Sequence, residues 1–196
     1  MNTIINEFPV FTYAELSDKA KEKVKWDFLS CEPRNWDFQD YCKDEVEYLF
    51  PNSGLEFAYS LGCCQGDGWT VYGKLDFSDI MEKVSEKYTE KEQRTLKWAF
   101  DEFMYYGMEF ELSRYNYSFN EWDYNNLIDE MEYYDMRSIP YKLIERFAED
   151  VNDWMGKFCS DMEKYGYDYL YNISDEEMEE ISDANGWEYM EDGTMF

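Results

Sequence analysis

The stretch YSLGCCQGDGWTVYG, residues 59–73, places a glycine-rich segment between two runs of alternating apolar residues. The first run is Leu55, Phe57, Tyr59, Leu61 and Cys63, and the second is Trp69, Val71, Leu75 and Phe77, with Gly73 as a gap. A period of two is typical of strands, and Asp-Gly between two strands is a strong hairpin signal because glycine readily adopts positive φ. We therefore predict a β-hairpin in which Gln65, Gly66, Asp67 and Gly68 form a structural turn, with Gly68 at positive φ.

Two functional interpretations compete with this turn. A glycine-rich loop also binds anions, but no Lys or Arg lies between Pro51 and Lys74, and a phosphate cradle normally contains one. The adjacent Cys63 and Cys64 suit redox chemistry, but no basic residue nearby in the sequence lowers a thiol pKa. The sequence favours a plain turn and buried or half-buried cysteines.

The rest of the chain alternates between helical and strand patterns. Ser17 caps a helix with Ala20, Val24 and Phe28 on one face, and a second helical face follows from Phe38 through Tyr41 or Cys42 to Leu49. Further helices are predicted from Ser78, after a Thr89–Glu92 capping box, from Ile139-Pro140 to Tyr165, and between Ser174 and Gly186. Residues 108–119 alternate again, and the last ten residues resemble a strand and turn.

These patterns predict an α+β fold, with a small antiparallel or mixed sheet of about four strands packed with five to six amphipathic helices. The 196 residues are 44% hydrophobic and 20% aromatic, which is enough to form a sizeable core. We expect residues 1–196 to form a single domain, with two small lobes as the alternative.

Charge is distributed unevenly along the chain, whose formal net charge is −27. Residues 1–98 carry 12 Lys and Arg against 19 Asp and Glu, whereas residues 99–196 carry 6 against 26. Such an excess repels nucleic acid and anionic membranes. We therefore expect a basic partner, no direct nucleic-acid binding and no membrane association.

Several mechanisms are excluded by residues that the chain lacks. It has no histidine, so it cannot form a Ser-His-Asp or Cys-His nucleophile system or a histidine metal site. Its five cysteines, an odd number without paired C-x-x-C spacing, indicate reduced thiols. No segment approaches the roughly 18 consecutive apolar residues of a membrane span, and the first ten residues lack a basic signal-peptide region. We expect a soluble, cytoplasmic protein without cofactors.

The order of elements resembles a widespread set of small, mostly uncharacterised proteins of phages and mobile elements. The resemblance covers most of the chain, and its specific parts are CQGDG at residues 64–68 and Glu191-Asp192-Gly193 near the end. Members of that set often have a histidine in the central strand pair, whereas SRYNYS at residues 113–118 has none. The resemblance implies a mobile-element origin and an accessory or anti-defence role.

The acidic half supplies the candidate binding residues. Its net −20 corresponds to the charge on about 34 Å of duplex DNA, so a carboxylate surface could mimic a phosphate path. We predict that the protein inhibits a basic nucleic-acid-binding protein of the host cytoplasm, such as a CRISPR effector or a restriction enzyme, by nucleic-acid mimicry. The predicted partner-binding carboxylates lie near 129–135, 145–153 and 175–183: Asp129, Glu130, Glu132, Asp135, Glu145, Glu149, Asp150, Asp153, Asp175, Glu176, Glu177, Glu179, Glu180 and Asp183.

Other functions remain open at this point. The protein could instead be an acidic interaction or assembly module of a mobile element, or more distantly a carboxylate-metal enzyme. DEEMEEISD at residues 175–183 lacks the spacing of a calcium loop, so we predict no metal site and no catalytic residues. The tyrosine pairs at 105–106 and 133–134 and the tyrosines of 165–171 could stack on bases, but the surrounding charge favours core and rim positions.

Overall fold

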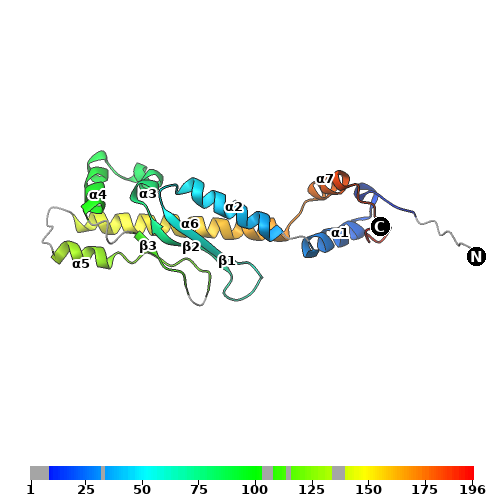
Figure 1. Ribbon diagram of the computed structural model, residues 1–196, viewed down its shortest axis with the longest axis horizontal. Helices are drawn as coiled ribbons and strands as arrows, with labels where there is room; N and C mark the ends of the chain where they lie inside the picture. Colours follow the sequence, from blue (N-terminus) through cyan, green and yellow to red (C-terminus); the bar gives the residue numbers. More distant parts are fainter. Residues whose placement is uncertain (1–8, 32–33, 103–107, 114–115, 134–139) are drawn as a thin grey trace, which may run out of the picture. The chain divides into compact units, whose positions relative to one another are not determined.

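The computed structural model describes residues 9–31, 34–102, 108–113, 116–133 and 140–196 (Figure 1). Within those ranges the chain has seven α-helices and a three-stranded antiparallel sheet, so the predicted α+β class is confirmed. The chain divides into two compact units. Unit 1 combines both ends of the chain, Met1–Phe38 and Tyr167–Phe196, and unit 2 is the continuous middle, Gln39–Gly166.

The sheet of unit 2 is built on the predicted hairpin. β1 (Gly54–Ser60) pairs antiparallel with β2 (Gly68–Leu75), and β3 (Met108–Phe110) pairs with the other side of β2, giving the order β1-β2-β3. The predicted count of about four strands is too high. Residues 116–119 form no strand because their backbone contacts the hairpin loop instead, where the Tyr117 N–H donates to the Gly66 carbonyl at 3.2 Å.

The core of unit 2 lies between the sheet and the long helix α6 (Tyr141–Tyr171). One face of α6 is completely buried, at Ile144, Phe147, Val151 and Met155. These positions recur every three to four residues, as predicted for a core-facing helix. Trp69 of β2 is 1% exposed and meets the Phe158 ring edge-on, with ring centroids 5.3 Å apart.

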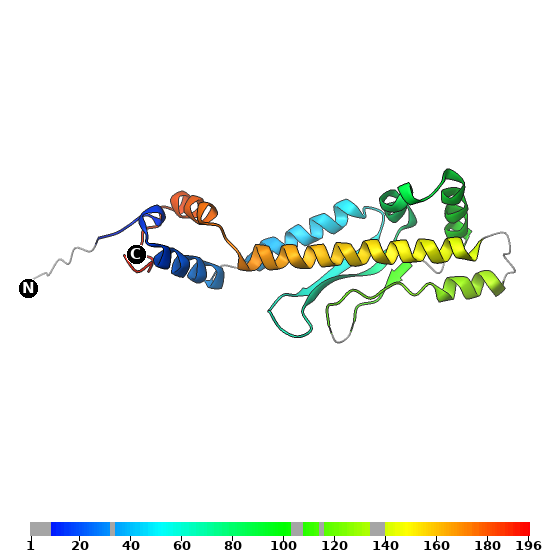
Figure 2. The same cartoon turned by 180° about the vertical axis from the view of Figure 1, so that it is seen from behind.

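The helix α2 (Arg34–Leu49) lies beside α6 in both views (Figures 1 and 2). Cys42 and Val46 are buried on it, whereas Tyr41 is 39% exposed. The sequence left open whether Tyr41 or Cys42 lies on the buried face of this helix. Cys42 does, one turn before Val46 on the same face.

Three shorter helices complete unit 2: α3 (Phe77–Val84), α4 (Glu90–Glu102) and α5 (Asn125–Tyr133). The Thr89–Glu92 capping box at the start of α4 is confirmed: the Thr89 N–H donates to Glu92 at 2.9 Å, and the Glu92 N–H donates to the Thr89 hydroxyl at 3.3 Å. Such reciprocal bonds satisfy backbone donors that the first helical turn leaves unpaired.

A buried carboxylate fixes α3 to the segment before β1. Asp79 is 3% exposed and accepts hydrogen bonds from the Asn52 backbone N–H at 2.9 Å, the Asn52 side-chain amide at 2.7 Å and the Ser53 hydroxyl at 2.7 Å. These three donors compensate for the loss of hydration that burial imposes on a charged group.

Unit 1 has its own core. It is formed by α1 (Asp18–Cys31) and α7 (Asp175–Asn185) together with Tyr13 and Tyr189; its buried members include Ala20, Val24 and Met178. The C-terminal strand expected from the sequence is reduced to two isolated bridges, Phe11↔Tyr189 and Tyr189↔Met195. Gly193 turns the chain between Tyr189 and Met195 at φ 82°, where glycine is favoured.

None of the described helices is both long and apolar enough to cross a membrane.

Candidate functional site

The helix α7 is held in unit 1 by a cap at each end and by one buried face. The Ser174 hydroxyl accepts from the Glu177 N–H at 3.0 Å, and Gly186 ends the helix in the left-handed conformation, both as predicted. Met178 and Ser182 are fully buried. The Ser182 hydroxyl donates to the Met178 carbonyl at 2.7 Å and lies 2.7 Å from the Tyr189 hydroxyl, so this face cannot rotate outward without breaking the contact with Tyr189.

The opposite face of α7 carries four carboxylates, which we call the acidic face of α7: Glu176, Glu179, Glu180 and Asp183. At 100° per residue these positions fall within one side of the helix, away from Met178. Glu179 is half-buried and the other three are exposed. Within the described part of the chain, none of the four forms an ion pair.

The other two predicted carboxylates of α7 have partners within unit 1. Asp175 pairs with Lys25 at 3.0 Å and accepts from the Tyr13 hydroxyl at 3.0 Å. Hydrogen bonds from Lys25 and then Tyr13 lower the pKa of Asp175. Glu177 pairs with Arg34 at 2.9 Å. Asp175 and Glu177 therefore stabilise unit 1 and are less available to a partner.

The remaining predicted carboxylates lie in unit 2. On α5, Asp129 and Glu132 are both exposed. The Glu130 side chain and all of Asp135 lie outside what the structure describes. On α6, Glu145, Glu149 and Asp153 are exposed at four-residue intervals, and no described residue forms an ion pair with them.

The α6 row is weaker than the acidic face of α7 because cations share its side of the helix. Lys142 is exposed one turn from Arg146, whose guanidinium pairs with Glu92 at 2.8 Å and lies 4.6 Å from the Tyr88 ring centroid. The structure thus divides the predicted set into two groups, one in each unit, and α7 has the higher density of unpaired charge.

Asp150 differs from its neighbours on α6 because it is half-buried and paired. Its carboxylate accepts from the Lys87 ammonium and the Tyr88 hydroxyl. Burial opposes the ionisation of Asp150, but the bonds from Lys87 and Tyr88 outweigh burial and lower its pKa. The role of Asp150 in the structure is to join α6 to the segment before α4.

The QGDG loop is organised by one of its own side chains. Asp67 accepts from the Ser60 hydroxyl at 2.9 Å and from the Cys64 N–H at 2.8 Å, which closes the loop between β1 and β2. Gln65 is exposed. The predicted positive φ at Gly68 is wrong, because Gly66 (φ 96°) and Cys63 (φ 58°) adopt it instead.

The cysteines follow the prediction only in part. Cys42, Cys63, Cys64 and Cys159 are free thiols, but Cys63 and Cys64 are exposed, contrary to the expected burial. The reason is the length of the loop, which carries both residues beyond the end of β1. Cys42 and Cys159 are buried, and burial raises their pKa values to about 11 and about 12.

No described residues form a cluster of three or more Asp, Glu, Cys or His that could hold a metal ion. The tyrosines predicted at the rim include Tyr133, which is 81% exposed, and Tyr171, which is 51% exposed. Tyr105, Tyr106 and Tyr134 lie outside the described residues.

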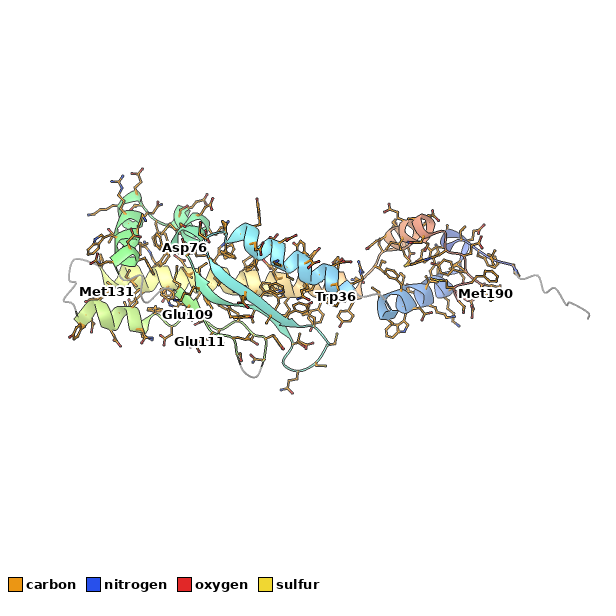
Figure 3. All side chains as sticks on the ribbon, in the orientation of Figure 1. Trp36, Asp76, Glu109, Glu111, Met131 and Met190 are labelled. Atoms are coloured by element: carbon orange, nitrogen blue, oxygen red, sulfur yellow. The ribbon has the colours of Figure 1, made fainter. Side chains whose placement is uncertain are left out.

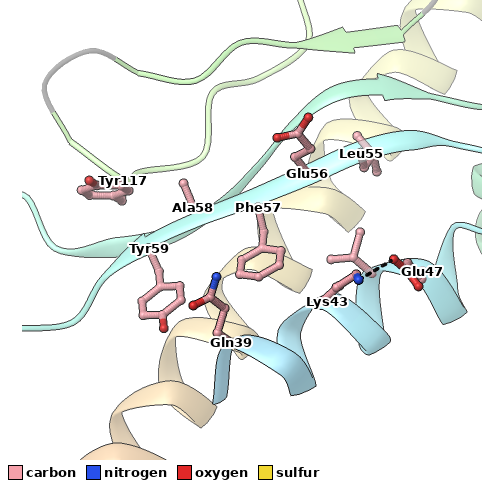
Figure 4. A pocket seen from close by; sticks show the side chains of 10 residues that line it. Gln39, Lys43, Glu47, Leu55, Glu56, Phe57, Ala58, Tyr59 and Tyr117 are labelled. Atoms are coloured by element: carbon pink, nitrogen blue, oxygen red, sulfur yellow. Dashed lines mark ion pairs between the residues drawn. The ribbon is translucent and has the colours of Figure 1, made fainter. Parts of the chain in front are cut away.

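A hollow of about 500 Å³ in unit 2 was not anticipated from the sequence (Figure 4). It lies between α2 and β1. Its lining residues are Gln39, Lys43, Val46 and Glu47 of α2, residues 55–59 of β1, and Tyr117. No sequence signal identifies this hollow, because the place of β1 at the edge of the sheet depends on the order of strands in space.

No protein-family model, curated protein or solved structure matches this chain.

Proposed function

We propose that this protein is a non-enzymatic inhibitor that occupies the nucleic-acid-binding surface of a basic protein in place of the nucleic acid. The acidic face of α7 carries the proposal. It consists of carboxylates without cationic partners in the described chain, on a helix that is held by its caps and its buried Met178 face.

The charge density of this face is comparable to that of nucleic acid. The eight residues from Glu176 to Asp183 occupy about 12 Å of helix, so the four carboxylates provide about one charge per 3 Å. Duplex DNA provides about one per 1.7 Å, and a single strand about one per 3.4 Å. A groove of Lys and Arg side chains that binds a phosphate path therefore meets a similar charge on α7.

Exposed aromatic residues in the same unit support a protein partner. Trp26 on α1 is 72% exposed. Trp36 on α2, which is labelled in Figure 3, is 71% exposed. Aromatic side chains dominate the binding energy of many protein interfaces. They supply the apolar contacts that charge alone does not.

The proposed partner class is a CRISPR effector or a restriction enzyme in the cytoplasm of a host cell. The support for this finer statement is the resemblance of the CQGDG and Glu-Asp-Gly motifs to proteins of phages and mobile elements.

A competition assay tests the proposal. Purified restriction enzymes and CRISPR effector complexes are each mixed with labelled nucleic acid and increasing amounts of this protein, at about 50 and about 200 mM salt. This protein should displace the nucleic acid from at least one of these enzymes or complexes. The displacement should be weaker at high salt because salt screens exposed charges.

A matched pair of variants makes the test specific. Reversing Glu176, Glu180 and Asp183 to Lys should weaken displacement at least tenfold. Reversing Asp27, Asp44 and Glu86 changes the net charge equally at exposed positions elsewhere and should have a smaller effect. If the protein and the nucleic acid bind a partner together without weakening each other, mimicry is wrong and the interaction-module alternative replaces it.

A further inference from the structure

β1 is an edge strand of the described sheet, and residues 55–58 lie within it. In the order β1-β2-β3 its neighbour is β2, and no backbone hydrogen bond between described residues outside that pairing involves residues 55–58. In an antiparallel pair, every second residue directs its N–H and C=O away from the partner strand. The outer side of β1 therefore presents a row of backbone donors and acceptors that a further strand could pair with.

The hollow beside β1 follows this edge. Successive side chains of a strand point to opposite faces, so a hollow on one face would be lined by every second residue. All five residues from Leu55 to Tyr59 line this hollow. Figure 4 shows Phe57 and Tyr59 directed toward α2, and Glu56 and Ala58 directed to the other side. A hollow that reaches both faces must lie along the edge between them.

The usual protections of an edge strand are missing from β1. Natural edges are commonly blocked by lysine, proline, a bulge or a very short strand. β1 has seven residues, GLEFAYS, with no Lys, Arg or Pro and with Glu56 as its one charged residue. An added strand would meet no steric or cationic barrier from the side chains of β1.

We propose that this edge accepts an extended basic segment of a partner protein as an additional β-strand. On the α2 side, Val46 and the half-buried Leu55 and Phe57 would receive apolar side chains. On the other side Glu56, exposed, would lie opposite a lysine of the added strand. The bound segment therefore alternates apolar and basic residues.

Charge selects this occupant over a second copy of the chain. The protein has a net charge of −27, so two copies repel each other. In the hollow itself, Lys43 pairs with Glu47 at 3.8 Å, which leaves the Glu56 carboxylate as the excess charge. Glu56 also accepts from the Tyr72 hydroxyl at 2.7 Å, which fixes its position on the sheet.

The test uses a fluorescein-labelled peptide of alternating lysine and valine that matches β1 in length, with binding followed by fluorescence anisotropy. Two further peptides carry N-methyl groups, one on every lysine and the other on every valine. Strand pairing uses the N–H groups of alternate residues, so one methylated peptide should keep its affinity and the other should lose at least about tenfold. Equal affinities of the two methylated peptides, or no binding of the parent peptide, would overturn the proposal.

Charge-reversal variants test the assigned contact. Glu56→Lys should lower the affinity for the lysine peptide at least fivefold and should raise the affinity for a peptide with glutamate in place of lysine. Glu82→Lys, on the exposed side of α3, makes the same change of charge away from the hollow and should have little effect. Equal weakening by both variants would show general attraction and contradict strand addition.

This edge is distinct from the acidic face of α7, and the two proposals fail separately. Reversing Glu176, Glu180 and Asp183 should change peptide affinity no more than an equal reversal elsewhere in the chain. If the protein forms a homodimer and Glu56→Lys dissociates it, the edge of β1 binds a second copy of the chain. That result would refute the basic-peptide proposal and would leave the proposal of nucleic-acid mimicry unaffected.

Discussion

The backbone carbonyl of Tyr117 lies against Gly68 so closely that a Cβ added to residue 68 would be 2.6 Å from the Tyr117 oxygen. This contact joins the first residue of β2 to a distant later segment of the chain. It also explains why residue 68 is glycine although its φ is not positive.

Gly68→Ala should therefore destabilise unit 2 by about 1–3 kcal/mol, because the backbone on one side or the other has to move to admit the methyl group. Urea denaturation measures the effect. Gln65→Ala, at an exposed position of the same loop, serves as the control and should lie within about 0.5 kcal/mol of wild type. A Gly68→Ala variant as stable as wild type would show that this contact is loose.

Asp79→Ala should be among the most damaging single changes in unit 2. It leaves the Asn52 N–H, the Asn52 amide and the Ser53 hydroxyl without their acceptor, at a cost of about 2–4 kcal/mol. Thermal unfolding compares it with Glu82→Ala, an exposed change on the same helix that should shift the melting temperature little. Equal stability of the two variants would contradict the structural role of Asp79.

Glu92 should make the folded state sensitive to acid. Hydrogen bonds from the Thr89 N–H, from Arg146 and from the Thr89 hydroxyl lower its pKa from the ordinary 4.5 to about 2. A carboxyl whose pKa is lower in the folded than in the unfolded state stabilises the fold at pH values above its unfolded-state pKa. For Glu92 this stabilisation is lost as the pH falls from about 4.5 to about 2.

The stability difference between wild type and Glu92→Gln should consequently be largest above about pH 5 and should shrink as the pH approaches about 2. Urea midpoints at several pH values measure it, with Glu82→Gln as the control. A difference that does not change between about pH 6 and about pH 3 would contradict the assigned hydrogen bonds.

The four described thiols should divide into two reactivity classes. Exposed Cys63 and Cys64 should be alkylated by iodoacetamide in the native protein, whereas buried Cys42 and Cys159 should react only after denaturation. Peptide mapping by mass spectrometry distinguishes the two classes. Modification of Cys159 in the native protein would show that unit 2 opens readily.

Local signals predicted most of the helices because the interactions behind them span only a few residues. The Ser174 cap, the Thr89–Glu92 box and the turn at Gly186 are complete within a few residues of sequence, and each forms as expected. The alternating apolar residues on both sides of QGDG also located the two strands of the hairpin correctly, although Asp-Gly does not form its turn because Gly68 is the first residue of β2.

The errors arise where a distant segment decides the conformation. Residues 116–119 alternate like a strand but contact the hairpin loop, and the φ of Gly68 follows from its place in β2 instead of from the turn. For the candidate site, acidic composition identified α7, but which of its carboxylates are unpaired depends on Lys25 and Arg34, which lie at the other end of the sequence.

A ribosome making this protein releases α1 well before it has made α7, with which α1 shares a core. Residues 39–166 separate the two parts of unit 1, and at about 5–20 residues per second their synthesis takes roughly 6–25 s. When that interval ends, the middle of the chain has its whole sequence, whereas the apolar face of α1, with Ala20 and Val24, still has no partner helix. The nascent protein thus passes through a stage in which the whole sequence of unit 2 has been made but the apolar face of α1 is not covered, and that face is buried only after the C-terminal part of unit 1 has been made.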